Sequence, residues 1–357
     1  MRRILRQLFP CLAALAAGVS AHAAPDHVDI TWMSIANMHF DLGSQQILAD
    51  GYITRLPQEI FYGGGGGFAA TRRSARPDVE AVREVFDAIG GRSAVKLLLT
   101  GHSHWDHSFD TATWARLSRA RIIGSPTTCL QAHAGGIPAR RCTPVYGGEK
   151  ITLERGVDMY VIRWNHSGDP AKNGEQHDPV ELAAEPVPDA TGALRAGVTE
   201  DFPNGGGNRA YLFTVDGASG RFSWLFQDSA SAVDLRTPIV IDGKDYGAPL
   251  DNLRRAMKTA GLESVDLWIA TGGHDVATLV LPVLKPKAYL PVHWDGLFGA
   301  FKAGPPQPYS DDALASLLAQ AGVQRIVPTQ YMDRWRLDRN GIRSVDNGAV
   351  KHRLGFH

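Results

Sequence analysis

The sequence predicts an α/β fold made of two similar β-rich halves, each covered by helices. Short apolar runs rich in β-branched residues alternate along the chain with segments whose apolar residues recur at helical spacing. The 357 residues suffice for one large domain or two smaller ones, and we find no short repeat and no linker that divides them. Packing both halves into a single domain is therefore the simplest arrangement.

The first 23 residues have the layout of a secretory signal. Three arginines precede an apolar stretch, and small residues ending at Ala23 provide a cleavage site. Pro10 interrupts the apolar stretch, which falls short of the ~20 residues that a membrane span needs, so a retained anchor is the weaker alternative. We expect a mature domain of residues 24–357, periplasmic or secreted, with no stable membrane insertion.

Charge and cysteine content limit the partners and the chemistry. The chain has 37 basic and 37 acidic residues, and loss of the signal deletes three arginines and no acid. Because there is no basic stripe, we expect a small-molecule substrate and no nucleic acid. In an oxidising compartment Cys129 and Cys142 form either a disulfide or two small buried thiols, and their spacing does not decide between these.

The elements of the first half follow in chain order. Strands are expected at 28–35 and 45–56, and a helix over 76–91 that ends at a glycine pair. The five glycines at 63–67 lack the Lys-Ser/Thr of a phosphate loop, so we interpret them as a turn or a rim of the site. A short apolar strand at 93–100 reads as buried on both faces. Then come a helix at 111–120 and strands at 121–125 and 156–164.

The second half begins with a segment rich in Pro, Gly, Asp and Glu, about 167–208, which is too long for a plain connection. We interpret it as an insertion over the site. Residues 209–228 predict a hairpin with its turn near Asp216-Gly217. The helix at 310–322 offers Ser310 as an N-cap. The remaining expected elements are helices at 249–261 and 275–286, strands at 264–271, 287–293 and 324–328, and a hairpin around 339–341.

The segment "HSHWDH" directly follows the buried strand at 93–100. Open α/β sheets place their sites at such strand ends. On an extended segment His102 and His104 point to the same side, so they can hold one ion. Asp106 and His107, just past the turn, can face a second ion close by. A solvated His-rich loop is the alternative, but chance seldom assembles this order after a buried strand.

His-x-His-x-Asp-His after a hydrophobic strand resembles the signature of the metallo-β-lactamase fold superfamily. The resemblance covers nearly the whole mature chain, from "DITWM" to "PVHW". The ending "LKPKAYLPVHW" is similar to the branch that includes ascorbate-phosphate lactonases and N-acyl-phosphatidylethanolamine phospholipases. The resemblance implies an α/β four-layer αββα sandwich.

The resemblance also implies three further ligands, each at a later strand end. His166 would complete the first metal site, Asp228 would bridge the two metals, and His293 would complete the second site. Their respective competitors are His177, Asp234 and His274.

Pro-Val-His-Trp matches the family pattern, so we prefer His293 as the ligand. We assign His274 and Asp106 to catalysis. His274 would either support a ligand or face the substrate. One departure concerns Asp228, which is followed by Ser-Ala rather than the Gly-flanked pattern common in the family.

The predicted cofactor is a pair of divalent ions. Zinc is the first expectation, and manganese or iron also suits His and Asp ligands. His104 stands where a Glu would indicate a redox di-iron site, so the resemblance favours hydrolysis. We expect a metal-bridging hydroxide that attacks an ester-like bond, either a lactone or a phosphodiester. The alternatives are a β-lactamase, which the bridging Asp228 fits poorly, and a non-catalytic metal-binding protein with the same fold.

Overall fold

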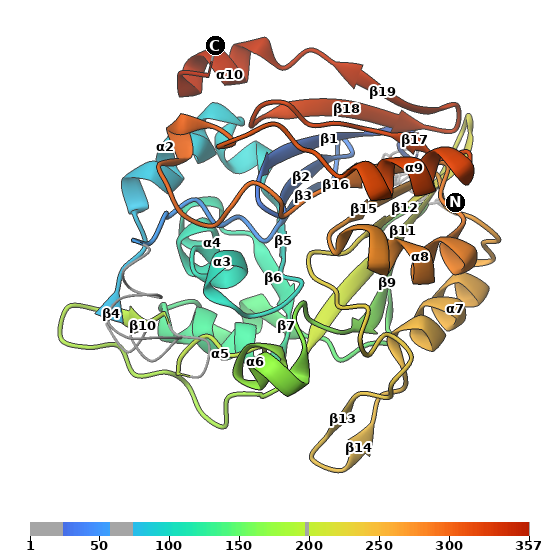
Figure 1. Ribbon diagram of the computed structural model, residues 1–357. Helices are drawn as coiled ribbons and strands as arrows, with labels where there is room; N and C mark the ends of the chain where they lie inside the picture. Colours follow the sequence, from blue (N-terminus) through green and yellow to red (C-terminus); the bar gives the residue numbers. More distant parts are fainter. Residues whose placement is uncertain (1–23, 58–73, 197–199, 357) are drawn as a thin grey trace, which may run out of the picture.

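Two large β-sheets pack face to face, and helices cover the outer face of each, which gives four layers (Figure 1). The structure is a computed structural model, and it describes residues 24–57, 74–196 and 200–356. The predicted signal at 1–23 and the glycine run at 63–67 lie outside the described residues. No helix within these ranges is long and apolar enough to cross a membrane.

The first sheet has eight strands in the order β19-β18-β1-β2-β3-β5-β6-β7. Strand β5 lies parallel between β3 and β6, so the carboxyl ends of these three strands meet at one edge. The bounds are β1 His27–Ser34, β2 Asn37–Asp41, β3 Gln46–Ala49, β5 Leu97–Leu99, β6 Arg121–Gly124, β7 Cys142–Pro144, β18 Asp333–Asp338 and β19 Gly341–Val345.

The second sheet has seven strands in the order β17-β16-β15-β12-β11-β9-β8. Its bounds are β8 Lys150–Glu154, β9 Val157–Trp164, β11 Asn208–Gly217, β12 Gly220–Phe226, β15 Leu267–Ala270, β16 Ala288–Pro291 and β17 Gln324–Arg325. Two small antiparallel pairs lie outside these sheets: β4 Ser74–Ala75 with β10 Leu194–Arg195, and β13 Val240–Ile241 with β14 Lys244–Asp245.

Helices α7, α8 and α9 lie along the second sheet, while α2, α4, α5 and α10 lie along the first (Figure 1). The α-helix bounds are α2 Val79–Ala88, α3 Trp105–Ser108, α4 Thr111–Ser118, α5 Pro126–Ala134, α6 Pro170–His177, α7 Pro249–Ala260, α8 Gly273–Leu284, α9 Asp312–Gln320 and α10 Gly348–Leu354. Short 3-10 helices occupy η2 Gly91–Ala94, η3 Ala139–Arg141 and η4 Phe301–Ala303.

Large aromatic side chains fill the space between the two sheets. The rings of Phe213 and Trp224, from neighbouring strands of the second sheet, stack at a centroid distance of 4.6 Å. Phe40 of the first sheet packs on Trp224 at 5.7 Å. Since each of these rings is fully buried, the core holds the two sheets together and fixes where their strand ends meet.

Most predicted elements are present, with shifts at their ends. Helix α9 begins after Asp311, whose side chain accepts a hydrogen bond from Leu314 N, so Ser310 is not the N-cap. The β11–β12 turn lies two residues later than expected, at Ala218 and Ser219. The strand expected at 45–56 ends at Ala49, because Asp50 adopts a positive φ of 61°.

The segment at 167–208 contains elements that the sequence did not indicate. Helix α6 has the sequence PAKNGEQH, which carries no apolar stripe, and it is capped by Asp169. Strand β10 pairs with β4, so this segment reaches back to the first half of the chain.

Candidate metal centre

The "HSHWDH" segment follows β5 after Thr100 and Gly101 and runs into the short helix α3. The Ser108 hydroxyl donates to Ser103 O at 2.8 Å and lies 3.1 Å from His104 O, and Gln131 Nε2 donates to Ser103 O. These bonds hold the segment in a tight turn at the edge where β3, β5 and β6 end. All four predicted ligands of the segment are buried: His102, His104, Asp106 and His107.

Three histidines from two sheets form a first group. His102 and His104 come from the turn after β5, and His166 follows β9 in the second sheet. Nδ1 of His104 lies 3.1 Å from Nε2 of His102 and 3.0 Å from Nε2 of His166. The strand ends of both sheets therefore bring three imidazole nitrogens to one point.

A second group joins Asp106, His107 and His293. Oδ2 of Asp106 lies 3.2 Å from Nε2 of His107 and 3.1 Å from Nε2 of His293. The two Nε2 atoms are 3.3 Å apart. The groups lie side by side, since the rings of His102 and His107 have a centroid distance of 4.0 Å.

Asp228 follows β12 and contacts one histidine of each group. Its Oδ2 lies 2.9 Å from Nδ1 of His102 and 3.2 Å from Nδ1 of His107. Its Oδ1 is buried with no hydrogen-bond partner among the described residues. A side chain at Gly101 would collide with this carboxylate, so the glycine is required for the close approach.

Hydrogen bonds at the Nδ1 atoms orient the ligands. The carboxylate of Asp228 accepts from His102. The carbonyl of Ser167 accepts from Nδ1 of His166 at 2.7 Å. Because Nδ1 carries the proton in both rings, each Nε2 presents a lone pair to the first group.

Asp50 has the same relation to the second group, although no motif in the sequence indicates it. Its Oδ2 accepts a hydrogen bond from Nδ1 of His107 at 2.8 Å, and its Oδ1 accepts one from Gly101 N. The available signal was position: Asp50 follows β3, which lies parallel and adjacent to β5. Burial and the charge of Asp228 raise the pKa of Asp50 to about 7.

His293 is held by the turn between β1 and β2. Its backbone adopts a positive φ of 63°, and its N–H donates to Ile35 O. The carboxylate of Asp295 accepts hydrogen bonds from Ile35 N and from the hydroxyl of Tyr331. These hydrogen bonds hold His293, which follows β16 of the second sheet, against the β1–β2 turn of the first sheet. No sequence pattern indicates the role of Asp295.

Burial sets the protonation of the first group. It holds the pKa of each of its histidines well below the usual range, and neighbouring imidazoles add to the effect for His102, His104 and His166. The neutral imidazole is the form that binds metals. In the second group burial alone would lower the pKa of His107, but three surrounding carboxylates raise it well above the usual range: Asp106, Asp50 and Asp228.

The residues present fit divalent ions. In the first group two Nε2 lone pairs face Nδ1 of His104 at about hydrogen-bond distance, and one proton cannot satisfy all three nitrogens. The second group combines a carboxylate oxygen with two Nε2 atoms. Nitrogen and oxygen donors in sets of three are typical of zinc and of similar first-row ions.

The other predicted residues lie outside these groups. His274 is the second residue of helix α8, its side chain is 44% exposed, and its Nδ1 lies 3.0 Å from the carboxylate of Asp275. The competitor His177 is buried, and it contacts Asp234 at 2.7 Å and the carbonyl of Ser167 at 3.2 Å. His177 and Asp234 thus pair with each other next to His166, and neither belongs to the two ligand groups.

Three solved structures are similar to this chain. A metallo hydrolase from the archaeon Ignicoccus hospitalis aligns with a TM-score of 0.50 at 11% identity, covering 87% of this chain and 99% of that protein. A protein described as a possible metal-dependent hydrolase, from Veillonella parvula, has a TM-score of 0.47 at 14% identity and the same two coverages. A metallo-β-lactamase fold protein from Bacillus subtilis has a TM-score of 0.45 at 10% identity, again over 87% and 99%.

The chain shares the fold of the Ignicoccus hospitalis metallo hydrolase. No family model and no curated protein matches the sequence. In this fold the predicted four layers are confirmed, and the His/Asp groups lie at the strand ends where the two sheets meet. Similarity at this level of identity shows the fold alone.

Proposed function

We propose that this chain is a hydrolase that uses two divalent metal ions to cleave an ester-like bond, either a lactone or a phosphodiester. The observation that carries the proposal is the pairing of the tri-histidine group with the Asp106, His107 and His293 group where the strand ends of the two sheets meet. Two ions held close together supply Lewis acidity and make hydroxide available near neutral pH.

Each of the two ligand groups would hold one ion. His102, His104 and His166 would hold one ion, and the second group would hold the other. Asp228 supplies negative charge between the groups, and its unpaired Oδ1 is free to face a cation. Asp50 and the Ser167 carbonyl keep the Nε2 atoms directed inward.

The substrate would approach beside His293. Among the seven predicted ligands this side chain is the most exposed, at 24%, while the others are buried. Aromatic residues adjoin two of the ligands in sequence: Trp294, next to His293, packs on Tyr309, and Trp105, next to Asp106, stacks on Phe298 at 5.8 Å. Aromatic side chains at the site would suit a substrate with an apolar body and a polar scissile group.

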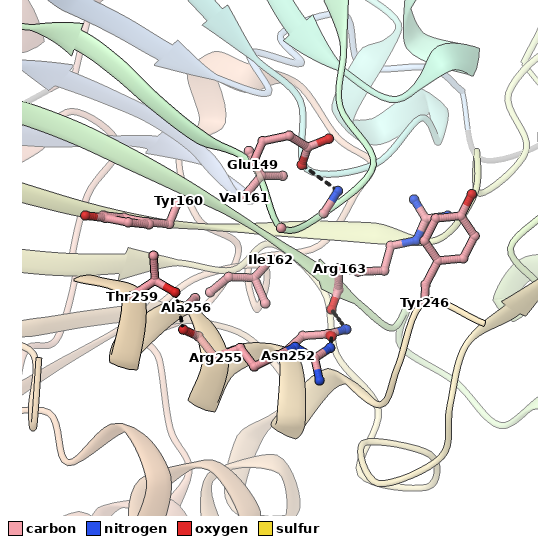
Figure 2. A pocket seen from close by; sticks show the side chains of 12 residues that line it. Glu149, Tyr160, Val161, Ile162, Arg163, Tyr246, Asn252, Arg255, Ala256 and Thr259 are labelled. Atoms are coloured by element: carbon pink, nitrogen blue, oxygen red, sulfur yellow. Dashed lines mark hydrogen bonds between the residues drawn. The ribbon is translucent and has the colours of Figure 1, made fainter. Parts of the chain in front are cut away.

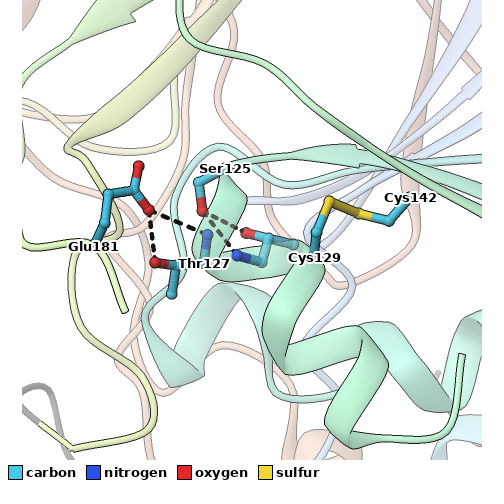
Figure 3. The surroundings of a disulfide bond; sticks show 6 residues. Ser125, Thr127, Cys129, Cys142 and Glu181 are labelled. Carbon is cyan, nitrogen blue, oxygen red and sulfur yellow. Dashed lines mark hydrogen bonds between the residues drawn. A yellow bond between two sulfur atoms is a disulfide. The ribbon is translucent and has the colours of Figure 1, made fainter. Parts of the chain in front are cut away.

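Export is a separate part of the proposal. Cys129 of α5 and Cys142 of β7 form a disulfide with a Cα–Cα distance of 5.5 Å (Figure 3). Disulfides persist in oxidising compartments, which supports a periplasmic or secreted protein whose signal is residues 1–23. The test is cell fractionation with mass spectrometry of the N-terminus. A mature chain that still carries Met1 in the cytoplasm would contradict export.

The central experiment measures metal content and turnover together. Purified protein should contain about two ions per chain by elemental analysis. It should hydrolyse a lactone or bis-p-nitrophenyl phosphate and leave nitrocefin, the β-lactamase substrate, intact. His104→Ala should lower both the bound metal and, by at least about 100-fold, the turnover.

His133→Ala is the matched control. Its side chain is about half exposed and contacts Glu185, outside both groups, so metal content and turnover should not change. A fully metallated protein that turns over no substrate of the panel would instead be a binding protein. Unchanged metal and activity in His104→Ala would refute the metal-centre assignment.

A further inference from the structure

A cavity of about 290 Å³ lies on the outer side of the second sheet, and none of the seven predicted metal ligands lines it (Figure 2). Its walls come from the turn before β8, from strand β9, from helix α7 and from the loop before α7. The volume corresponds to roughly ten water molecules, enough for a small organic ligand. The lining includes Glu149, Tyr160, Arg163, Tyr246, Arg255 and Ala256.

Arg163 lines this cavity and is an unusual buried cation. The residue is 2% exposed, and its Nε and Nη1 are buried with no hydrogen-bond partner among the described residues. Burial, together with the charge of Arg209, lowers the pKa of Arg163 to about 9. The guanidinium therefore stays charged at neutral pH, and an unpaired buried charge of this kind is costly.

The nearby carboxylates are already engaged. Glu181 lies 3.5 Å from Nη2 of Arg209 and accepts hydrogen bonds from the backbone and hydroxyl of Thr127. Glu149 accepts from two backbone N–H groups, at Tyr146 and Gly147. The charged residues that line the cavity are Arg163, Arg255 and Glu149. Two guanidiniums and one carboxylate leave a single positive charge to be balanced.

The other charged group is Arg255 on helix α7. Its guanidinium donates to the Asn252 side chain and makes no ion pair among the described residues. Aromatic and apolar groups complete the walls: the Tyr246 ring lies 4.3 Å from the Arg163 guanidinium carbon, and Tyr160 and Ala256 border the same space (Figure 2). The cavity therefore offers one uncompensated positive charge beside an apolar and aromatic surface.

We propose that this cavity binds a small organic monocarboxylate, with its carboxylate bound by the accessible Arg255 close to the buried charge of Arg163, and with its apolar body against Tyr160 and Ala256. A guanidinium is well matched to a planar carboxylate, and one negative charge balances the site. The proposal is independent of the metal centre, because no predicted metal ligand contributes to the cavity.

The test is calorimetric titration of the intact protein with benzoate, with neutral isosteric benzamide and with inorganic phosphate. We expect saturable binding of benzoate and none of benzamide. Arg255→Met should weaken benzoate binding at least about tenfold, because a charge-assisted hydrogen bond is lost. Arg254→Met is the matched control on the same helix, since Arg254 is exposed and pairs with Asp251, and it should bind benzoate as wild type does.

Benzoate could also reach the metal centre, but such binding would persist in Arg255→Met, so only the difference between wild type and variant counts. Arg163→Met should lose benzoate binding as well. Should that variant fail to fold, Tyr246→Leu supplies the second test with the same expected loss. Equal benzoate binding by wild type and Arg255→Met overturns the proposal. Phosphate binding as tight as benzoate binding overturns the assignment to an organic carboxylate.

Discussion

Oδ2 of Asp50 lies 2.8 Å from Nδ1 of His107, and both groups are buried at the edge where β3 and β5 end. The contact fixes the orientation of the His107 ring, so that its Nε2 faces Asp106 and His293. A carboxylate outside the ligand set therefore decides which atom of the ligand is available.

Substitution of Asp50 should weaken metal binding without removing a ligand. Asp50→Ala is expected to lower the affinity for one of the two ions by about 10–100-fold, because the His107 ring is no longer held in one orientation. Chelator competition measures this affinity. Asp50→Asn, which keeps an acceptor oxygen, should be affected less. If Asp50→Ala binds both ions as tightly as wild type does, the orienting role is wrong.

The local part of the site could be predicted from sequence, because His102, His104, Asp106 and His107 lie within six residues after one buried strand. His166 and His293 also end strands, so the fold brings them to the same edge. The choice between His293 and His274 needed the family pattern, since both follow apolar strands.

The supporting residues could not be predicted in the same way. Asp50 lies within an apparently continuous strand pattern, and only its positive φ separates it from β3. Asp295 acts on Ile35 and Tyr331, which are distant in sequence, so no local spacing indicates the contact. Which nitrogen of His102 meets Asp228 also depends on how the two sheets pack, and no sequence pattern encodes it.

Gly101 should tolerate no side chain. Its Cβ would overlap the Asp228 carboxylate, so Gly101→Ala must displace that group or the turn after β5. We expect unfolding to become easier by about 1–3 kcal/mol, measured by urea denaturation. Gly174→Ala, inside helix α6, is the control and should leave stability unchanged or slightly raised. Wild-type stability of Gly101→Ala would show that the close approach is not required.

Loss of Asp295 should weaken binding of the ion at the Asp106, His107 and His293 group and spare the ion at the tri-histidine group. Asp295→Ala removes the acceptor for Ile35 N and for the Tyr331 hydroxyl. The turn at Ile35, which accepts the hydrogen bond from His293 N, is then held less firmly. Elemental analysis should find metal content falling from about two ions per chain toward one, because the tri-histidine group is untouched. Asp275→Ala, at an exposed carboxylate, should retain both ions. Equal loss of both ions in Asp295→Ala would contradict a selective role.

The disulfide between Cys129 and Cys142 should stabilise the first half of the fold, because it ties helix α5 to the edge strand β7 (Figure 3). The two residues are 13 positions apart, and closing a loop of this size restricts the unfolded chain by about 3 kcal/mol. The double variant Cys129→Ala with Cys142→Ala should lose that much unfolding free energy in urea. A thiol reductant should destabilise the wild-type protein by a similar amount and leave the double variant unchanged. If the reductant acts equally on both proteins, its effect does not come from this bond.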